Sequence, residues 1–107
     1  MKDLIKEELV FIEKNADLLR NNYDPVIFEF KGFEEKYFCI MEFSPFSIQI
    51  DIKTEPSIHF LFTEKEECIV IVKRSESRKM DEDEEEIFKR FIESIYERLK
   101  KQHDAWY

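Results

Sequence analysis

The sequence predicts an α+β two-layer sandwich, in which a five-stranded antiparallel meander is flanked by an N-terminal and a C-terminal helix. Three observations support this fold. Residues 46–53 alternate apolar and polar side chains without a break, other apolar runs of strand length lie nearby, and amphipathic stretches occupy both ends of the chain. A period of two is typical of a strand with one buried face, and a period near 3.6 of a helix. At 107 residues, the chain fits a single domain spanning 1–107.

Both terminal stretches carry apolar side chains at steps of three and four, as a helix with one buried face requires. In the first predicted helix, residues 2–21, the apolar positions are Leu4, Ile5, Leu9, Ile12, Ala16 and Leu19. The second predicted helix starts at Asp81 and runs to about residue 103. Glu84 stands three residues after Asp81, which is the spacing of a capping box.

Five runs between the helices have the length and composition of strands: Val26–Lys31, Tyr37–Phe43, Phe46–Lys53, Ser57–Thr63 and Cys68–Lys73. The links between them are short, and several carry turn-forming residues, such as Ser44-Pro45. Links of this length favour antiparallel hairpins over helical crossovers. The polar residues Ser75–Met80 are expected to form a linker to the second helix.

The short links also predict how the strands pair. The link after Phe43 predicts that this residue faces Phe46, which places Cys39 opposite Ile50. The next link places Ile50 opposite Phe60. Both registers send the large apolar side chains to one face of the sheet, which we expect to be the core.

The opposite face of the predicted sheet mixes apolar and polar side chains. Its rows across three strands are Phe38, Asp51 and His59, then Ile40, Gln49 and Leu61. The fifth run is apolar on both sides, so this face is extended by either Ile69 and Ile71 or Val70 and Val72. A sheet face left to water is usually more uniformly polar. Surface hydrophobes can be isolated, and a helix or the C-terminal tail can cover this side. Alternatively, a partner or a second copy docks here.

Charge and composition exclude several classes of function. A formal net charge of −8 disfavours nucleic acid and anionic membranes as partners, because phosphate neutralisation needs clustered Lys and Arg. With a single Gly, the chain has neither a P-loop nor a dinucleotide-binding glycine pattern, and it shows no zinc-ligand spacing. We therefore expect no cofactor and no metal. Acids interrupt the N-terminal apolar residues, and no apolar run is long enough to span a membrane, so we expect a cytoplasmic protein.

Asp51 and His59 are the candidates for chemistry. If they lie opposite each other, the carboxylate can orient the imidazole as a general base requires. Nothing nearby in the sequence supplies a nucleophile, and Cys39 is expected on the core face. Flat sheet faces also make poor pockets. We expect a protein that is not an enzyme, and catalysis through Asp51 and His59 stands as an alternative.

Acidic residues gather in two segments: Glu64, Glu66 and Glu67, and the run Asp81, Glu82, Asp83, Glu84, Glu85 and Glu86. Consecutive carboxylates entering a helix radiate in several directions, so they do not converge on a cation as a calcium-binding loop does. The run is either a solvated helix start or, with the upstream acids, a negative patch that attracts a basic partner and raises its association rate.

In size, acidity and helix-flanked sheet, the chain resembles small bacterial proteins that occupy another protein, such as toxin-neutralising immunity proteins and secretion chaperones. The resemblance covers no motif and transfers no residue role. It implies a non-enzymatic protein that binds and occludes a basic partner such as a toxin. The expected contact residues are the outward rows and the acids named above. The alternative is a homodimer, chaperone-like or structural, that buries its outer sheet face against a second copy.

Overall fold

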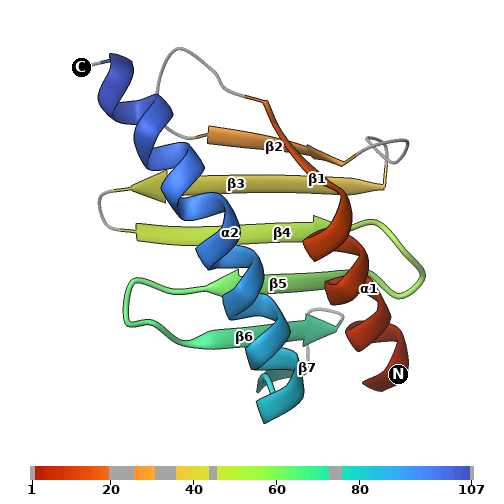
Figure 1. Ribbon diagram of the computed structural model, residues 1–107. Coiled ribbons are helices and arrows are strands. Elements are labelled where there is room, and N and C mark those ends of the chain that lie inside the picture. Colours follow the sequence, from red (N-terminus) through yellow and green to blue (C-terminus); the bar gives the residue numbers. More distant parts are fainter. Residues whose placement is uncertain (1, 20–25, 31–35, 44–45, 73–75, 107) are drawn as a thin grey trace.

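The computed structural model describes residues 2–19, 26–30, 36–43, 46–72 and 76–106, and it places side chains for 3–16, 36–42, 46–72 and 76–97. The described elements, in chain order, are α1 (Lys2–Asn15), β1 (Ala16–Leu19), β2 (Val26–Phe30), β3 (Tyr37–Phe43), β4 (Phe46–Ile52), β5 (Ile58–Phe62), β6 (Cys68–Val72), β7 (Glu76–Lys79) and α2 (Glu82–Trp106). The strands form one sheet in the order of the sequence, and each pairs antiparallel with the next. Both helices lie on the same face of this sheet (Figure 1).

The predicted fold class is confirmed. The five predicted strands correspond to β2–β6, with ends that agree to within one residue, and they form an antiparallel meander between the two helices. The predicted register is confirmed as well, with Phe43 paired to Phe46, Cys39 to Ile50, and Ile50 to Phe60. The Ser44-Pro45 link itself lies outside the described residues.

The predicted end of the first helix at residue 21 is wrong. The helix ends at Asn15, whose side-chain Nδ2 donates to the carbonyl oxygen of Phe11 at 3.0 Å. Residues 16–19 instead form β1, which pairs with β2 at the edge of the sheet. Ladder hydrogen bonds formed with a neighbouring strand override a helical spacing of apolar residues, because propensity alone is a weak determinant.

The predicted linker at 75–80 is also wrong. Glu76–Lys79 forms β7, an edge strand whose pairing with β6 places Arg78 opposite Val70. Its sequence, Glu-Ser-Arg-Lys, lacks the apolar alternation by which strands are recognised. Edge strands are commonly short and charged because such residues discourage pairing with another chain. The same polar composition therefore fits a loop and an edge strand.

The core lies between the sheet and the two helices. Ile50 and Phe60 from the centre of the sheet are fully buried, and the ring of Phe60 lies 6.1 Å from that of Phe88 on α2. From α1, Leu9 and its apolar neighbours one turn away on either side join the same cluster. Leu4, which the helical spacing placed on the buried stripe, is 38% exposed.

A buried polar cluster fixes α1 against β3. The Glu8 carboxylate accepts hydrogen bonds from the Tyr37 hydroxyl and from Lys36 Nζ, the latter at 2.9 Å. The ring of Phe11 stacks on Tyr37 with centroids 5.4 Å apart. Burial, together with the hydrogen bond to Glu8 and its charge, raises the pKa of Tyr37 well above its usual value. The phenol therefore stays protonated and acts as the donor in this contact.

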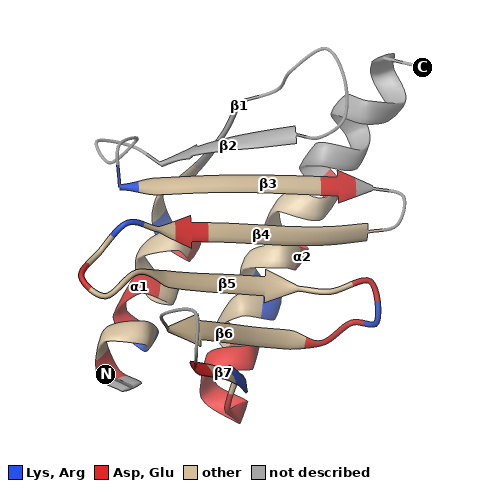
Figure 2. Cartoon of the chain, turned by 180° about the vertical axis from the view of Figure 1, so that it is seen from behind, with Lys and Arg blue, Asp and Glu red and all other residues tan. Residues whose placement is uncertain are grey.

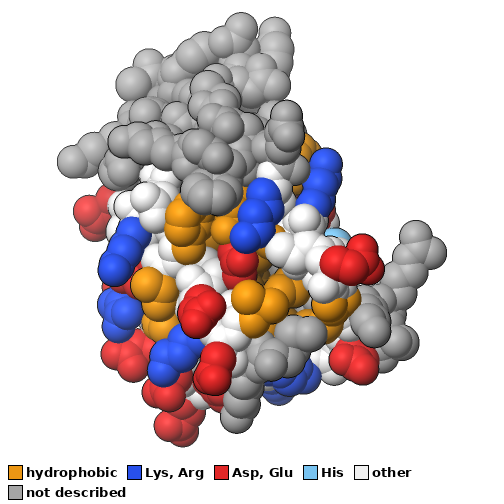
Figure 3. All heavy atoms as spheres, turned by 90° about the vertical axis from the view of Figure 1, so that its right-hand side faces the viewer, with side chains coloured by type: hydrophobic (Ala, Val, Ile, Leu, Met, Phe, Trp, Pro, Cys, Tyr) orange, Lys and Arg blue, Asp and Glu red, His pale blue; other side chains and the backbone are white. Residues whose placement is uncertain are grey.

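The two helices also meet each other through ion pairs. Arg90 on α2 contacts Glu13 on α1, with Nε and Oε1 3.1 Å apart, and Lys6 lies 3.7 Å from Asp83. The side of the molecule that faces the viewer in Figure 3 shows acidic and basic side chains interspersed around small apolar patches. On that side, the described surface carries no large area of one charge.

Candidate functional site

The sheet face opposite the helices is the first candidate site. Figure 2 views the molecule from this side, with the strands in front of both helices. We call this surface the outer face; its rows are Phe38, Asp51, His59 and Ile71, and Ile40, Gln49, Leu61 and Ile69. Phe38 is 43% exposed, and the other apolar members are half-buried. Among the described residues, no helix or strand of the chain covers this face.

The predicted pair is present on the outer face. His59 Nδ1 lies 2.7 Å from Asp51 Oδ1, and the two side chains are 35% and 25% exposed. Gln49 Nε2 donates to both Asp51 oxygens, at 3.1 and 3.2 Å. The carboxylate is thus held between an amide and an imidazole. The arrangement can orient the imidazole, but the described groups that touch Asp51 include no hydroxyl or thiol.

The choice between the two sides of the fifth predicted strand is settled by its pairing. Ile69 pairs with Leu61 and Ile71 with His59, so both extend the outer face. Val70 and Val72 are buried on the helix side. The apolar residues of the outer face therefore lie on β3, β5 and β6, whereas β4 contributes the polar Gln49 and Asp51 between them.

Both cysteines lie on the helix side of the sheet. Cys39 is fully buried and Cys68 is 6% exposed, and both are free thiols. Burial raises the pKa of Cys39, and the charge of Asp51 adds to this effect. Burial and the charge of Glu85 raise the pKa of Cys68 to about 11, although Lys89 opposes the shift. A catalytic cysteine needs the opposite shift, because the thiolate is the nucleophile.

This predicts that both thiols are slow to react with a water-soluble disulfide reagent in the folded protein. A pKa of about 11 against the usual 9.0 lowers the thiolate fraction of Cys68 at pH 8 roughly a hundredfold. Release of the coloured thiol from Ellman's reagent measures this rate, and the same reaction in denaturant serves as the control. Rapid reaction of either thiol under native conditions would contradict the structure.

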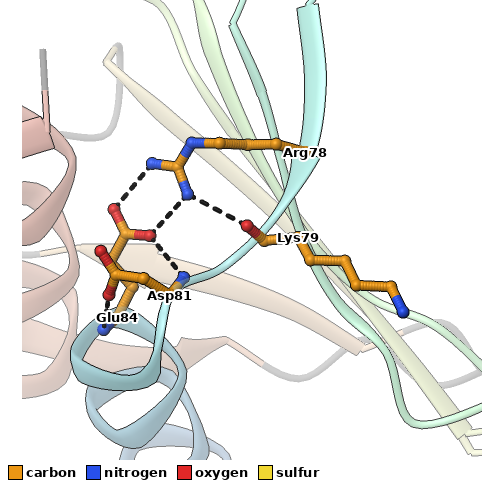
Figure 4. A network of polar contacts seen from close by, with 4 residues as sticks. All are labelled: Arg78, Lys79, Asp81 and Glu84. Carbon is orange, nitrogen blue, oxygen red and sulfur yellow. Dashed lines mark hydrogen bonds and ion pairs between the residues drawn. The ribbon is translucent and has the colours of Figure 1, made fainter.

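Most carboxylates of the acidic run at the start of α2 form hydrogen bonds or ion pairs with other groups of the same chain. Asp81 and Glu84 form the predicted capping box: Glu84 N donates to Asp81 Oδ1 and Asp81 N donates to Glu84 Oε1, both at 2.9 Å. Arg78 from β7 donates to both Glu84 oxygens, at 2.7 and 2.8 Å (Figure 4). Glu84 is 1% exposed, so its carboxylate does not reach the surface. Asp81 and Glu84 are therefore structural residues of this helix start.

The rest of the run remains on the surface. Glu82, Asp83 and Glu86 are exposed, and Glu85 is half-buried. Glu85 pairs with Lys89 at 2.7 Å, and Glu86 with Arg90 at 3.4 Å. Exposed pairs of this kind are weak, so these carboxylates can still attract a partner.

The upstream acids lie on the loop between β5 and β6. Thr63 organises this turn: its backbone N–H donates to the carbonyl of Glu67 at 3.0 Å, and its Oγ1 accepts from the Glu67 N–H at 3.2 Å. Glu66 adopts a left-handed conformation with a φ of 63°. Glu64 and Glu66 are exposed, and Glu67 is half-buried. The loop therefore presents carboxylates at one end of the sheet (Figure 2).

A second candidate site was missed by the sequence analysis. A hollow of about 540 Å³ opens between α2, the start of β4 and the end of β5, next to the β5–β6 loop. We call it the acid-rimmed hollow; it is lined by Phe46, Phe62, Ile92 and Tyr96 and by Glu64, Glu66, Glu93 and Glu97. The one available signal was the pair Glu93 and Glu97, which flanks Tyr96 one helical turn apart. Nothing in the sequence indicated that the helix would leave space there.

Comparisons of the chain with protein-family models, with curated proteins and with solved structures found no significant match.

Neither described helix is both long and apolar enough to cross a membrane. In the same part of the chain, His, Cys, Asp and Glu side chains form no group of three or more that is suited to holding a metal ion.

Proposed function

We propose that the chain is a non-enzymatic protein of the immunity or inhibitor type, which binds a basic protein partner and occludes it. The observation that carries the proposal is the outer face, where apolar residues of β3, β5 and β6 surround the polar Gln49 and Asp51 of β4 and no described element covers them. Isolated surface hydrophobes need no explanation, but an uncovered face on which several apolar residues are mixed with Asp, His and Gln is typical of a non-obligate interface.

The size of this face indicates that the contact extends beyond it. Four strands at a spacing of about 4.8 Å, with about five residues each at 3.3 Å, give a flat area of roughly 300 Å². A stable complex buries about 800 Å² on each partner. The β5–β6 loop adjoins the end of the sheet, and its Glu64 and Glu67 would supply additional contact area.

Charge complementarity selects the partner. The chain has a formal net charge of −8, and a basic partner would be steered toward it from solution. A toxin such as a nuclease has a basic cleft for its anionic substrate, and an acidic protein that covers the cleft blocks it. The two free thiols fit a reducing compartment such as the cytoplasm, where an intracellular toxin would have to be neutralised.

The same charge argues against a second copy as the occupant of the outer face, because two chains of net charge −8 repel each other. Catalysis through Asp51 and His59 also fits the geometry less well. A general base needs a reacting group within reach, and Gln49 occupies the position beside the carboxylate.

The test is capture of a basic partner from a native lysate with the wild-type chain and two variants. Leu61→Lys places a cation in the middle of the outer face, where it repels a basic partner, so we expect capture to fall at least about tenfold. Leu4→Lys is the matched control, since Leu4 is exposed on α1, on the other side of the sheet. Circular dichroism checks that both variants remain folded.

Charge reversal tests the loop separately. Glu64→Lys combined with Glu67→Lys is expected to slow association, while Glu82→Lys with Glu86→Lys, at the start of α2, is expected to have a smaller effect. Sedimentation of the wild-type chain tests the homodimer. A complex that tolerates Leu61→Lys and ignores salt, or a chain that sediments as a dimer, would overturn the proposal.

A further inference from the structure

The acid-rimmed hollow lies on the helix side of the sheet, separate from the outer face. Its lining includes three aromatic rings that meet edge to face, which we call the aromatic floor. The ring of Phe46 lies 5.0 Å from Tyr96 at an interplanar angle of 89°, and 5.6 Å from Phe62 at 67°. Aromatic rings that line a hollow attract organic cations, and their apolar bodies accept methylene groups.

Among the described residues, the charged side chains that line the hollow are all acidic. Glu64 and Glu66 approach from the β5–β6 loop, while Glu93 and Glu97 project from α2. Like charges at positions i and i+4 of a helix destabilise it, so a cation bound between Glu93 and Glu97 would relieve their repulsion. Lys89 lies near enough for its charge to interact with Glu66. Its ammonium group, however, pairs with the carboxylate of Glu85, with Nζ and Oε1 2.7 Å apart.

We propose that the acid-rimmed hollow binds a linear polyamine, with its methylene chain over the aromatic floor and its ammonium groups at the carboxylates on the two sides. A bare metal ion fits poorly, because half of the lining is apolar and offers no ligand. A single ammonium group would leave one side of the rim without a partner. The volume of about 540 Å³ lies within the range of small-molecule sites.

This site does not depend on the proposed function: the two share Glu64 on the β5–β6 loop, but the hollow uses no residue of the outer face, and Glu93 and Glu97 belong to the hollow alone. Calorimetric titration of the 107-residue chain with spermidine at fixed ionic strength tests it. We expect saturable one-to-one binding, with amide shifts in the nuclear magnetic resonance spectrum confined to Phe46 and residues 62–66 and 92–97. Butylammonium, with one charge, and Mg²⁺, with no methylenes, are expected to bind at least tenfold more weakly.

Variants separate specific binding from general charge attraction. Glu93→Gln combined with Glu97→Gln is expected to weaken spermidine binding about tenfold, because it removes one side of the rim. The matched control is Glu82→Gln with Glu86→Gln, which removes two carboxylates at the same spacing from the same helix and should change affinity less than twofold. Tyr96→Leu keeps an apolar side chain at this position but removes a π-face, so we expect a loss of about threefold.

Three results would overturn the proposal. Equal losses in the two double variants would mean that spermidine senses only the net charge. Equally tight binding of butylammonium would mean that one ammonium group, such as a lysine of a protein partner, satisfies the hollow. Displacement of spermidine by Mg²⁺ at the same ionic strength would mean that the carboxylates act without the rings.

Discussion

Replacing Phe60 with alanine is expected to lower the free energy of unfolding by about 3–5 kcal/mol and the melting temperature by roughly 15 °C or more. Phe60 is fully buried at the centre of β5, with Ile50 on one side and Val70 on the other. Its ring also contacts Phe88, which stacks on Phe91 at 6.2 Å. Truncation leaves a cavity between the sheet and α2 that neighbours on both layers can fill only partly.

Urea unfolding followed by circular dichroism measures this loss. Phe38→Ala is the matched control, because it removes the same side chain from the outer face, where Phe38 is 43% exposed. We expect that variant to lose less than about 1 kcal/mol. Similar losses for the two variants would mean that the buried and outer faces of the sheet are wrongly assigned, or that the outer face is covered in solution.

The sheet could be predicted from the sequence because the apolar–polar alternation of the strands and the short links between them both predict the same register. A slip of one residue in β4 would expose Ile50 and bury Gln49, so only one register satisfies both hairpins. This is why the row of Asp51 and His59 was predicted correctly, including their contact. The sidedness of β6 stayed open because Ile69 and Val70 are equally apolar.

The predictions failed where local pattern and tertiary pairing disagree. Residues 16–19 continue the helical spacing of α1, yet they pair with β2, and the polar residues 76–79 pair with β6. The acid-rimmed hollow could not be predicted for a different reason. Its shape depends on how α2 packs across the ends of β4 and β5, and no periodicity encodes the space left between them.

Replacing Glu84, which caps the start of α2, is expected to have the second large effect on stability. Burial opposes its ionisation, but the hydrogen bonds from Arg78 and from the Asp81 backbone outweigh this, so the pKa of Glu84 lies below its ordinary value of 4.5. Glu84→Gln removes the charge partner of Arg78 and weakens the capping box. We expect a loss of about 2 kcal/mol at neutral pH, less than for a fully buried pair because the Arg78 side chain is 39% exposed.

The pH dependence of this loss identifies its cause. A carboxyl group whose pKa is lower in the folded state stabilises the protein above its unfolded pKa. This contribution disappears as the pH falls from about 4.5 toward the folded value. The stability difference between the wild-type chain and Glu84→Gln should therefore shrink in acid, as measured by urea unfolding between pH 7 and pH 3.

Glu85→Gln provides the control for this experiment. Glu85 is the next residue on α2, but its side chain is 40% exposed and pairs with Lys89 on the surface. Its removal should change stability far less than Glu84→Gln, and the difference should vary little with pH, because water screens an exposed pair. A Glu84→Gln variant as stable as Glu85→Gln would show that the Arg78 contact does not hold β7 against the start of α2. A stability loss that stayed constant down to pH 3 would show that the hydrogen-bond acceptor lost on conversion to an amide, and not the lost charge, accounts for the effect.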